Sequence, residues 1–238
     1  MSTIKEIDLE GLETLSVIEK ADRFNEWMYK TIAPHCKGKI LEIGSGIGNI
    51  SKFFIDDKKE IVLSDLRDNY CEILRKKFSN PVIKIDLVAP DFDTQYANLL
   101  GTFDSLFALN VVEHIEDDLQ AIANCKKLLK TGGTLIILVP AYQWLFNNFD
   151  VELEHFRRYT QKSLKKIIVK NELTVKKLFS FNLIGILGWY VSGQILKKKT
   201  IPEGQMGLFN LLVPIFKIAD FVTFRKFGLS VICVSEKD

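Results

Sequence analysis

A short apolar segment that ends in closely spaced glycines constrains the fold of this chain more than any other feature. Residues 39–43 read Lys-Ile-Leu-Glu-Ile, and glycines follow at positions 44, 46 and 48. An apolar run of this length predicts a buried β-strand of a parallel sheet, because such strands are covered on both faces. Glycines directly after the strand let the backbone pass close to a ligand, where a Cβ would obstruct it. The segment therefore predicts a strand followed by a ligand-binding loop.

Strands and helices alternate along most of the chain. Apolar runs that end in turn residues predict strands, and the stretches of about ten residues between them predict helices. This alternation is typical of an α/β fold with a parallel sheet and right-handed crossovers. We expect helices at 11–37, 48–57, 67–78, 116–129 and 160–170, a turn at 130–133, and strands at 39–44, 61–65, 81–86, 103–109, 134–139, 173–181 and 228–235.

The domain organisation follows from the same pattern. Residues 1–37 predict an N-terminal helical cap, and residues 38–182 with 225–238 predict a continuous α/β domain. Residues 183–224 form an apolar helical insertion, or lid, before the last strand. A chain of 238 residues has the length for one such domain and an insertion.

Composition excludes several classes of protein. The hydrophobic fraction of 47% and the charged fraction of 26% are those of a globular protein rather than a disordered one. The first residues lack the apolar stretch of a secretion signal, and no run reaches the length of a membrane-spanning helix. The scattered cysteines, without a CxxC pair, predict reduced, buried residues. We expect a cytoplasmic chain, with membrane association as an alternative.

The net charge of +2 is unevenly distributed. Residues 155–199 hold eleven Lys or Arg and one acid, so this segment carries +10 and the rest of the chain −8. A solvated helix face explains the lysines of 162–170. The alternative is an anionic partner, either a phosphate-bearing substrate or a membrane surface.

Polar residues stand where successive predicted strands end. Asp65 follows Gly44 by twenty-one positions, about the spacing at which an acid accepts hydrogen bonds from ribose hydroxyls. Asp86 can accept one from an exocyclic amine such as that of adenine, with Leu87 packing on the ring, and Asn110 follows the fourth strand. Ligands bind at the carboxyl ends of strands in open parallel sheets, so these residues favour an adenosine ligand.

The glycine spacing separates two classes of nucleotide. The dinucleotide fingerprint is GxGxxG, whereas this chain has GxGxG followed by Asn49. Glu42 has no role next to an anionic pyrophosphate, but it suits a cationic amino group or a sulfonium. A nicotinamide-dependent oxidoreductase therefore remains a distant alternative.

Five segments resemble, in order and spacing, the successive motifs of class I S-adenosylmethionine-dependent methyltransferases. They are ILEIGSGIGN, LSDL, KIDL, FDSLFALNVVEHI and LLKTGGTL, within about residues 38–140. The resemblance is to the small-molecule branch, which includes quinone-type and bacterial saccharide- or lipid-pathway enzymes. It implies a Rossmann-like α/β fold with a seven-stranded, mostly parallel sheet, an antiparallel last strand and helices on both faces.

The resemblance also implies that S-adenosylmethionine is the cofactor. Thr131 replaces the usual proline of the LLKPGG turn, a departure that puts no chemistry in doubt. Cofactor contacts are expected at Glu42, Gly44, Ser45, Gly46, Gly48, Asn49, Asp65, Leu66, Asp86, Leu87 and Asn110.

Three histidines are candidates for a general base. Methyl transfer from a sulfonium is an in-line displacement, so the protein must align the acceptor and often remove its proton. We assign this role to His155, in a loop after the fifth strand. His114 follows Glu113 near the expected methyl group, and its alternative role is to cap the next helix. His35 precedes the first strand and is expected to be structural.

The loop segment EHFRRYT resembles a motif of methyltransferases found beside glycosyltransferases in bacterial surface-polysaccharide pathways. Arg157 and Arg158 could clamp a phosphate or carboxylate of the acceptor, Tyr159 is a further catalytic candidate, and Glu113 a substrate-binding one. The alternative is that this cluster only forms the entry to a helix. Glu113 and His114 alone are too few ligands to predict a metal.

The insertion bears on the substrate class. Residues 208–224 are apolar except for Asn210, Lys217 and Asp220. Such a segment could form a lid over an apolar acceptor, a hairpin in a membrane surface with lysines at the phosphates, or an ordinary helical cap.

The leading hypothesis is O-methylation of a small or lipid-linked metabolite. The expected acceptor is of saccharide or polyprenyl/quinone type, and it could carry an anionic group. An RNA or protein methyltransferase and a non-catalytic S-adenosylmethionine-binding module are the alternatives. The fourth strand lacks the Asn/Asp-Pro-Pro-Tyr loop that holds a planar amino group, and no RNA-binding appendage is evident. We therefore do not expect nucleic acid as a partner, and nothing indicates an oligomeric state.

Overall fold

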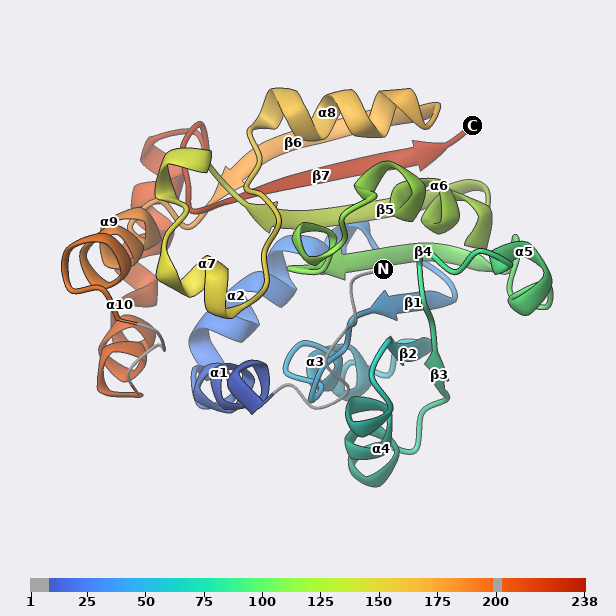
Figure 1. Cartoon of the computed structure of the whole chain (residues 1–238), viewed down its shortest axis with the longest axis horizontal. Coiled ribbons are helices and arrows are strands. Elements are labelled where there is room, and N and C mark those ends of the chain that lie inside the picture. The colour runs from blue at the N-terminus through green and yellow to red at the C-terminus, as the bar shows by residue number, and fades with distance from the viewer. Residues whose placement is uncertain (1–8, 199–202) are drawn as a thin grey trace.

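A seven-stranded sheet forms the centre of the computed structural model, which describes residues 9–198 and 203–238 (Figure 1). The strand order is β3-β2-β1-β4-β5-β7-β6. The first five strands pair in parallel, and β7 is antiparallel to both neighbours. This confirms the expected Rossmann-like sheet with its antiparallel last strand. The strands are β1 (Ile40–Ile43), β2 (Ile61–Asp65), β3 (Val82–Lys84), β4 (Phe103–Leu109), β5 (Leu129–Pro140), β6 (Leu173–Phe181) and β7 (Ser230–Lys237).

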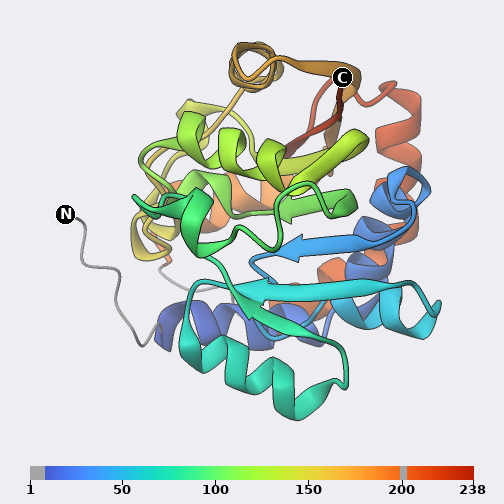
Figure 2. The same ribbon diagram turned by 90° about the vertical axis from the view of Figure 1, so that its right-hand side faces the viewer.

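Helices cover both faces of the sheet (Figures 1 and 2). One apolar core packs α5, α6 and α8 on the sheet, and a second packs α2, α3, α4 and α10 on the other face. Strands buried on both faces explain the continuous apolar runs of the sequence. The helices are α1 (Leu9–Glu19), α2 (Asp22–Ile32), η1 (Ala33–His35), α3 (Ser51–Asp56), α4 (Asp68–Lys77), α5 (Phe92–Gln95), η2 (Val112–His114), α6 (Asp118–Leu128), η3 (Gln143–Leu145), α7 (Asn148–Glu152), α8 (Gln161–Lys170), α9 (Gly185–Trp189), the π-helix η4 (Tyr190–Ile195) and α10 (Glu203–Val222).

Three local predictions need correction. The expected helix over 11–37 is interrupted at Ala21, whose N–H closes a turn on the carbonyl of Ile18. The expected turn at 130–133 belongs to β5, because Leu129 pairs with Phe103 before a register irregularity. Gly132, at φ +73°, accommodates the bend. The short helices α5 and α7 are absent from the predicted elements, because neither is long enough to show a helical hydrophobic period.

The insertion is helical, as expected, and is fixed to the end of β6. The carboxylate of Asp220 accepts hydrogen bonds from the backbone N–H groups of Asn182 and Leu183, both at 2.8 Å. The side-chain oxygen of Asn210 accepts from the N–H of Phe24 in α2 at 3.0 Å. Two of the three polar residues noted in this segment therefore face the protein. Lys199 and Pro202 lie outside the described residues.

The basic segment is divided among several surfaces. Its lysines at 162, 165, 166 and 170 are exposed on α8, as a solvated helix face predicts.

All four cysteines are free, and three of them are buried. Within residues 9–198 and 203–238, no helix combines the length and apolarity needed to cross a bilayer.

Asp220→Ala is expected to destabilise the fold. The change leaves two backbone N–H groups without their carboxylate acceptor, each costing about 1–3 kcal/mol when it stays buried. Lys217→Ala, on the same helix, is the matched control. Urea denaturation should show a lower free energy of unfolding for Asp220→Ala than for the control, and equal values would contradict this role.

Candidate active site at the carboxyl edge of β1 and β4

The loop after β1 requires glycine at positions 44, 46 and 48 for steric reasons. Gly44, Gly46 and Gly48 have φ values of +69°, +53° and +84°, which L side chains rarely adopt. A Cβ on Gly44 would lie 2.4 Å from the side chain of Val111, and one on Gly48 would lie 2.3 Å from Phe78. The loop is therefore packed closely between the ends of β1 and β4 on one side and α4 on the other.

The same loop is tied to β2 by hydrogen bonds. The N–H of Ser45 donates to the carbonyl of Ser64 at 2.8 Å, and the hydroxyl of Ser45 accepts from the N–H of Ser64 at 3.1 Å. The carboxylate of Asp65 accepts from the N–H of Gly46 at 2.9 Å and from that of Arg67 at 3.1 Å. Asp65 is buried, and desolvation raises its pKa. The acid expected to bind a ribose thus also fixes the glycine loop.

Glu42 lies buried beneath the loop. Its carboxylate accepts a short hydrogen bond from the hydroxyl of Ser51, at the start of α3. Burial raises the pKa of Glu42 to about 7, against the lowering effect of the bonds from Ser51 and Ser45, and the charge of Asp65 raises it further. Glu42 therefore braces the loop against α3, a role that the sequence analysis did not assign to it.

The first helix covers the glycine loop. The amide of Asn49 donates to the carbonyl of Leu15 in α1 at 2.9 Å, and a Cβ on Gly46 would meet the Leu15 side chain at 2.9 Å. The side-chain oxygen of Asn49 is buried and has no hydrogen-bond partner within residues 9–198 and 203–238. No motif in the sequence indicated that α1 would lie over this loop.

The remaining cofactor candidates stand at the same edge. Asp86 is half-buried and caps its own turn, accepting from the N–H of Val88 at 2.9 Å. Leu66 is half-buried, whereas Leu87 is buried in the core. Asn110 is exposed at the end of β4 with a φ of +54°. The strand ends thus bring the predicted residues to one edge, as the topology requires.

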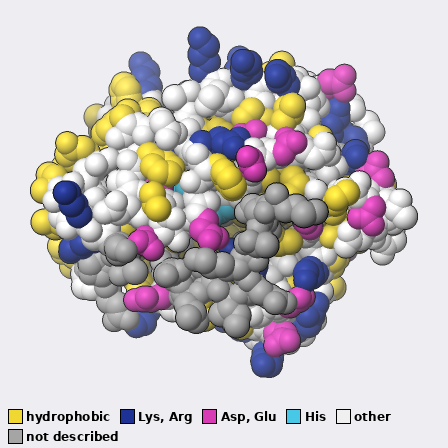
Figure 3. Space-filling model, in the orientation of Figure 1, with side chains coloured by type: hydrophobic (Ala, Val, Ile, Leu, Met, Phe, Trp, Pro, Cys, Tyr) yellow, Lys and Arg dark blue, Asp and Glu magenta, His cyan; other side chains and the backbone are white. Residues whose placement is uncertain are grey.

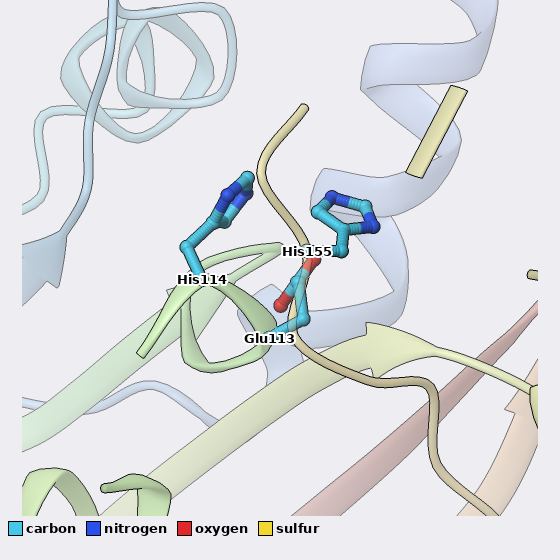
Figure 4. Close-up of side chains that lie close together, drawn as sticks. All are labelled: Glu113, His114 and His155. Carbon is cyan, nitrogen blue, oxygen red and sulfur yellow. The ribbon is translucent and has the colours of Figure 1, made fainter. Parts of the chain in front are cut away.

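Glu113, His114 and His155 form a cluster at the end of β4. Each offers one donor atom, and these atoms lie within 4.8 Å of one another; their side chains converge in Figure 4. The His114 and His155 rings stand edge to face with centroids 4.6 Å apart. The N–H of Phe156 donates to the carbonyl of Glu113 at 2.8 Å, which holds the His155 loop against η2.

Two members of this cluster are neutral near pH 7. Glu113 is buried, and neither of its oxygens has a hydrogen-bond partner among the described residues. Desolvation raises the pKa of Glu113 to about 8. Desolvation also lowers the pKa of His114 to about 3, with the charges of His155 and Arg67 acting in the same direction. Glu113 and His114 therefore add no charge beside His155 near pH 7.

Asp150 orients His155. One carboxylate oxygen lies 2.8 Å from His155 Nδ1 and 2.7 Å from Arg158 Nε, and the other accepts from the N–H of Asn147 at 3.0 Å. Burial opposes ionisation, but the bonds from His155 and Arg158 outweigh it and hold the pKa of Asp150 below its usual value. A carboxylate on Nδ1 requires the proton there, so Nε2 of neutral His155 keeps its lone pair.

Arg158 already has partners within the protein, because its guanidinium is buried against Asp150 and the carbonyl of Ala141. This corrects the prediction that Arg158 clamps the acceptor. Arg157 donates to the carbonyl of Glu116 at 2.7 Å and pairs with Asp118 at 3.0 Å. With 32% of its side chain exposed, Arg157 stays a predicted ligand of an anionic group.

Tyr159 is buried in the core, and its hydroxyl donates to Asp118 at 2.8 Å. Desolvation raises the pKa of this phenol, and the charge of Asp118 adds to the effect. A phenol held in this way is a poor proton acceptor. The geometry therefore supports the alternative reading of this segment as a helix entry, with His155 as the exception.

Glu113 and His114 alone are too few ligands to predict a metal from the sequence. His155 supplies a third potential ligand, which no local pattern could place beside them. Asp150 was also missed, although the spacing from Asn147 to Asp150 matches a helix capping box, which the structure contains. The spacing from Asn147 to Asp150 is therefore the sequence signal by which Asp150 could have been found.

Comparisons with known proteins identify the kind of domain that the central part of the chain forms. Residues 41–135 match a family model described as a methyltransferase domain. The ubiquinone biosynthesis O-methyltransferase of Xanthomonas campestris pv. campestris is 26% identical over 99 residues, which are 42% of this chain and 41% of that protein. The corresponding enzyme of Erwinia tasmaniensis is 25% identical over 130 residues, covering 53% and 51%. The chain thus spans about half or less of the length of these relatives.

Solved structures share the fold. A SAM-dependent methyltransferase from Archaeoglobus fulgidus aligns with a TM-score of 0.60 and 17% identity, over 90% of this chain and 94% of that one. Phosphoethanolamine N-methyltransferase 2 of Haemonchus contortus, in complex with S-adenosylmethionine, gives 0.57 and 15%, over 90% and 52%. With the family match, they confirm the prediction: the chain contains a class I S-adenosylmethionine-dependent methyltransferase domain.

The residues of this edge fit S-adenosylmethionine. Glu42 and Asp65 are buried carboxylates whose pKa values are raised by desolvation, and the charge of Asp65 raises that of Glu42 further. A sulfonium and an ammonium group nearby would stabilise both carboxylates in their ionised form. An anionic pyrophosphate would instead be repelled by these two carboxylates in their ionised form.

Glu42→Gln should change how stability depends on pH. In the folded chain the Glu42 carboxyl keeps its proton up to about pH 7. In the unfolded chain it has the ordinary pKa of 4.5 and is deprotonated above that pH. The stability from protonated Glu42 is therefore complete below pH 4.5 and is lost as the pH rises through 7. Between about pH 5 and 8, the free energy of unfolding should fall more in the wild type than in the variant, by a few kcal/mol. Parallel curves from urea titrations would contradict the assigned burial.

Proposed function

We propose, from the premise of a methyltransferase domain, that this chain transfers the methyl group of S-adenosylmethionine to an oxygen of a small or lipid-linked acceptor. The Asp150–His155 pair carries this proposal, because it places a base at the carboxyl edge beside the end of β4. An O-methyltransferase gains from a base that removes the hydroxyl proton as the oxygen attacks.

The pair has the geometry of an oriented base. The carboxylate of Asp150 fixes the His155 tautomer and stabilises the imidazolium that forms when Nε2 takes a proton. Arg158 keeps that carboxylate ionised and in place. We therefore assign proton removal to His155 and positioning to Asp150.

Glu113 and His114 would contact the acceptor. A protonated Glu113, whose carboxyl has no hydrogen-bond partner in the part of the chain that the structure describes, can donate to, and accept from, an acceptor hydroxyl. The neutral imidazole of His114 adds no charge that would oppose imidazolium formation at His155. Both residues therefore suit an uncharged hydroxyl group.

The cofactor supplies the electrophilic methyl group when bound. Asp65 would accept from its ribose hydroxyls, and the glycine loop would contact its methionine part. Asp86 would bind the adenine ring, with Glu42 and Asn49 holding the loop in place. In this arrangement the residues of the chain bind, orient and remove a proton, while the cofactor provides the leaving group.

The insertion supports an acceptor with an apolar part. Trp144 and Tyr190 border an apolar hollow of about 560 Å³, which is also lined by Leu183, Ile184, Ile186 and Leu187. The neighbouring Trp189 packs against the guanidinium of Arg158, at 4.7 Å from its ring centroid. Trp189 is next to Tyr190 of the hollow in sequence, and the contacts of Arg158 and Asp150 link Trp189 to His155. The partial similarity to ubiquinone biosynthesis O-methyltransferases favours the same acceptor class.

His155→Ala tests the assignment of the base. An acceptor is first identified by incubating the chain with methyl-labelled cofactor and lipid or aqueous fractions of the source cells. With it, His155→Ala should lower kcat by about 10²–10⁴-fold, the usual effect of a lost general base, and leave S-adenosylhomocysteine affinity unchanged. His35→Ala, which changes a histidine outside the cluster, is the control. Normal turnover by His155→Ala would remove the assignment.

Metal removal separates two roles for the cluster. If His155 takes the proton, dialysis against a chelator should leave kcat unchanged, because no step requires a cation. Loss of activity that Mn²⁺ or Zn²⁺ restores would assign Glu113, His114 and His155 to a metal instead. The comparison needs only the wild-type chain and the acceptor identified above.

A further inference from the structure

α10 is apolar on both of its sides. The side that faces the sheet and α2 holds the buried Val213 and Phe216, together with Asn210, hydrogen-bonded to Phe24, and Asp220, hydrogen-bonded to the end of β6. The opposite side is apolar and exposed. The solvent-facing side of a helix on a globular protein is normally polar. The outward side of α10 is formed by Leu208, Leu211, Ile215, Ile218 and Val222, which we call the outer stripe.

The outer stripe is continuous and strongly exposed. Its members recur at intervals of three and four residues, so they share one helix face. Each has between 59% and 65% of its side chain accessible. Phe224 and Phe227, in the turn after α10, extend the apolar surface and are 82% and 57% exposed. A contiguous apolar surface of this kind marks an interaction site.

The insertion adds further apolar side chains at the same end of the molecule. Leu187, Tyr190, Ile195 and Leu196 are exposed on α9, on η4 and directly after it. Figure 1 places α9 and α10 at the same end, and Figure 3 shows hydrophobic side chains gathered there. Trp144 borders this region and is 60% exposed. Tryptophan and tyrosine are the residues that favour the boundary between lipid and water.

Cations flank both ends of α10. Lys197 is exposed and Lys198 half-buried before the helix, and Arg225 and Lys226 follow it. Arg23 of α2 lies alongside, donating to the carbonyl of Leu211 at 3.3 Å. An apolar helix face with basic residues at its edges matches an anionic lipid surface, in which phosphates lie around the acyl chains.

We propose that the outer stripe docks on a bilayer that contains anionic phospholipids. α10 would lie in the plane of the interface, with the apolar stripe among the acyl chains and the flanking cations at the phosphates. It would not cross the bilayer, and no described helix is able to. The protein body occupies the side of α10 that water covers in a free amphipathic helix.

A second copy of the chain fits this surface less well than a bilayer does. Both ends of α10 are basic, so stripe-to-stripe packing in either direction would bring cations of one copy close to cations of the other. Like charges facing one another oppose association. An anionic bilayer instead neutralises both ends.

Vesicle flotation of the full chain tests the proposal. Wild type should bind vesicles of phosphatidylcholine with phosphatidylglycerol, and bind less to phosphatidylcholine alone or at raised salt. Leu211→Glu with Ile218→Glu should lower the partition coefficient by about tenfold or more, because charged groups would enter the acyl region. Leu119→Glu with Val169→Glu, which adds the same charge at exposed apolar residues of α6 and α8, should bind like wild type.

Folding and oligomerisation are followed in the same variants. Circular dichroism and S-adenosylhomocysteine binding should match wild type in both double variants, so failure of the methyltransfer proposal is distinguishable from failure of this one. Should the stripe variant not fold, Phe224→Ser provides the same test in a turn and should also lower vesicle binding. Three results would overturn the proposal: no binding by wild type, equal binding by folded stripe or Phe224 variants, or a wild-type dimer that the stripe variant converts to monomer.

Discussion

The position of β1 between β2 and β4, parallel to both, is the constraint on which the site depends. In this register Ile43 pairs with Ser64 on one side and with Ala108 on the other, so the three strands end together. The glycine loop, Asp65 and Asn110 therefore meet at one edge, although they are far apart in sequence. This is also where the strand order reverses, and where open parallel sheets bind ligands.

Buried carboxylates organise this edge in two places. Glu42 and Asp65 hold the glycine loop, and Asp150 holds the loop of His155. Each accepts bonds from backbone N–H groups or from side chains, which offsets the cost of removing its charge from water. The guanidinium of Arg158 is bonded to Asp150, whose pKa is lowered, whereas the pKa values of Glu42 and Asp65 are raised. Glu42 and Asp65 are thus suited to a cationic ligand, whereas Asp150 is suited to staying ionised.

The sequence was sufficient for the sheet and the cofactor edge because both follow from local patterns. The strand at 61–65 was predicted to the residue, since apolar runs and turn residues define strand ends directly. The contacts of Arg157, Arg158 and Tyr159 were not predictable in this way, because Asp118 and Asp150 reach them only through tertiary packing. The π-helix and the exposed apolar side of α10 were likewise hidden, since a helix that is apolar on both sides does not indicate which side faces the protein.

Calorimetric titration of the wild-type chain tests the central claim, that the edge formed by β1, β2 and β4 binds a sulfonium nucleoside. The account predicts saturable binding of S-adenosylhomocysteine with one site per chain, and no heat from NADH. Binding of NADH, or no binding of S-adenosylhomocysteine by a folded chain, would contradict it.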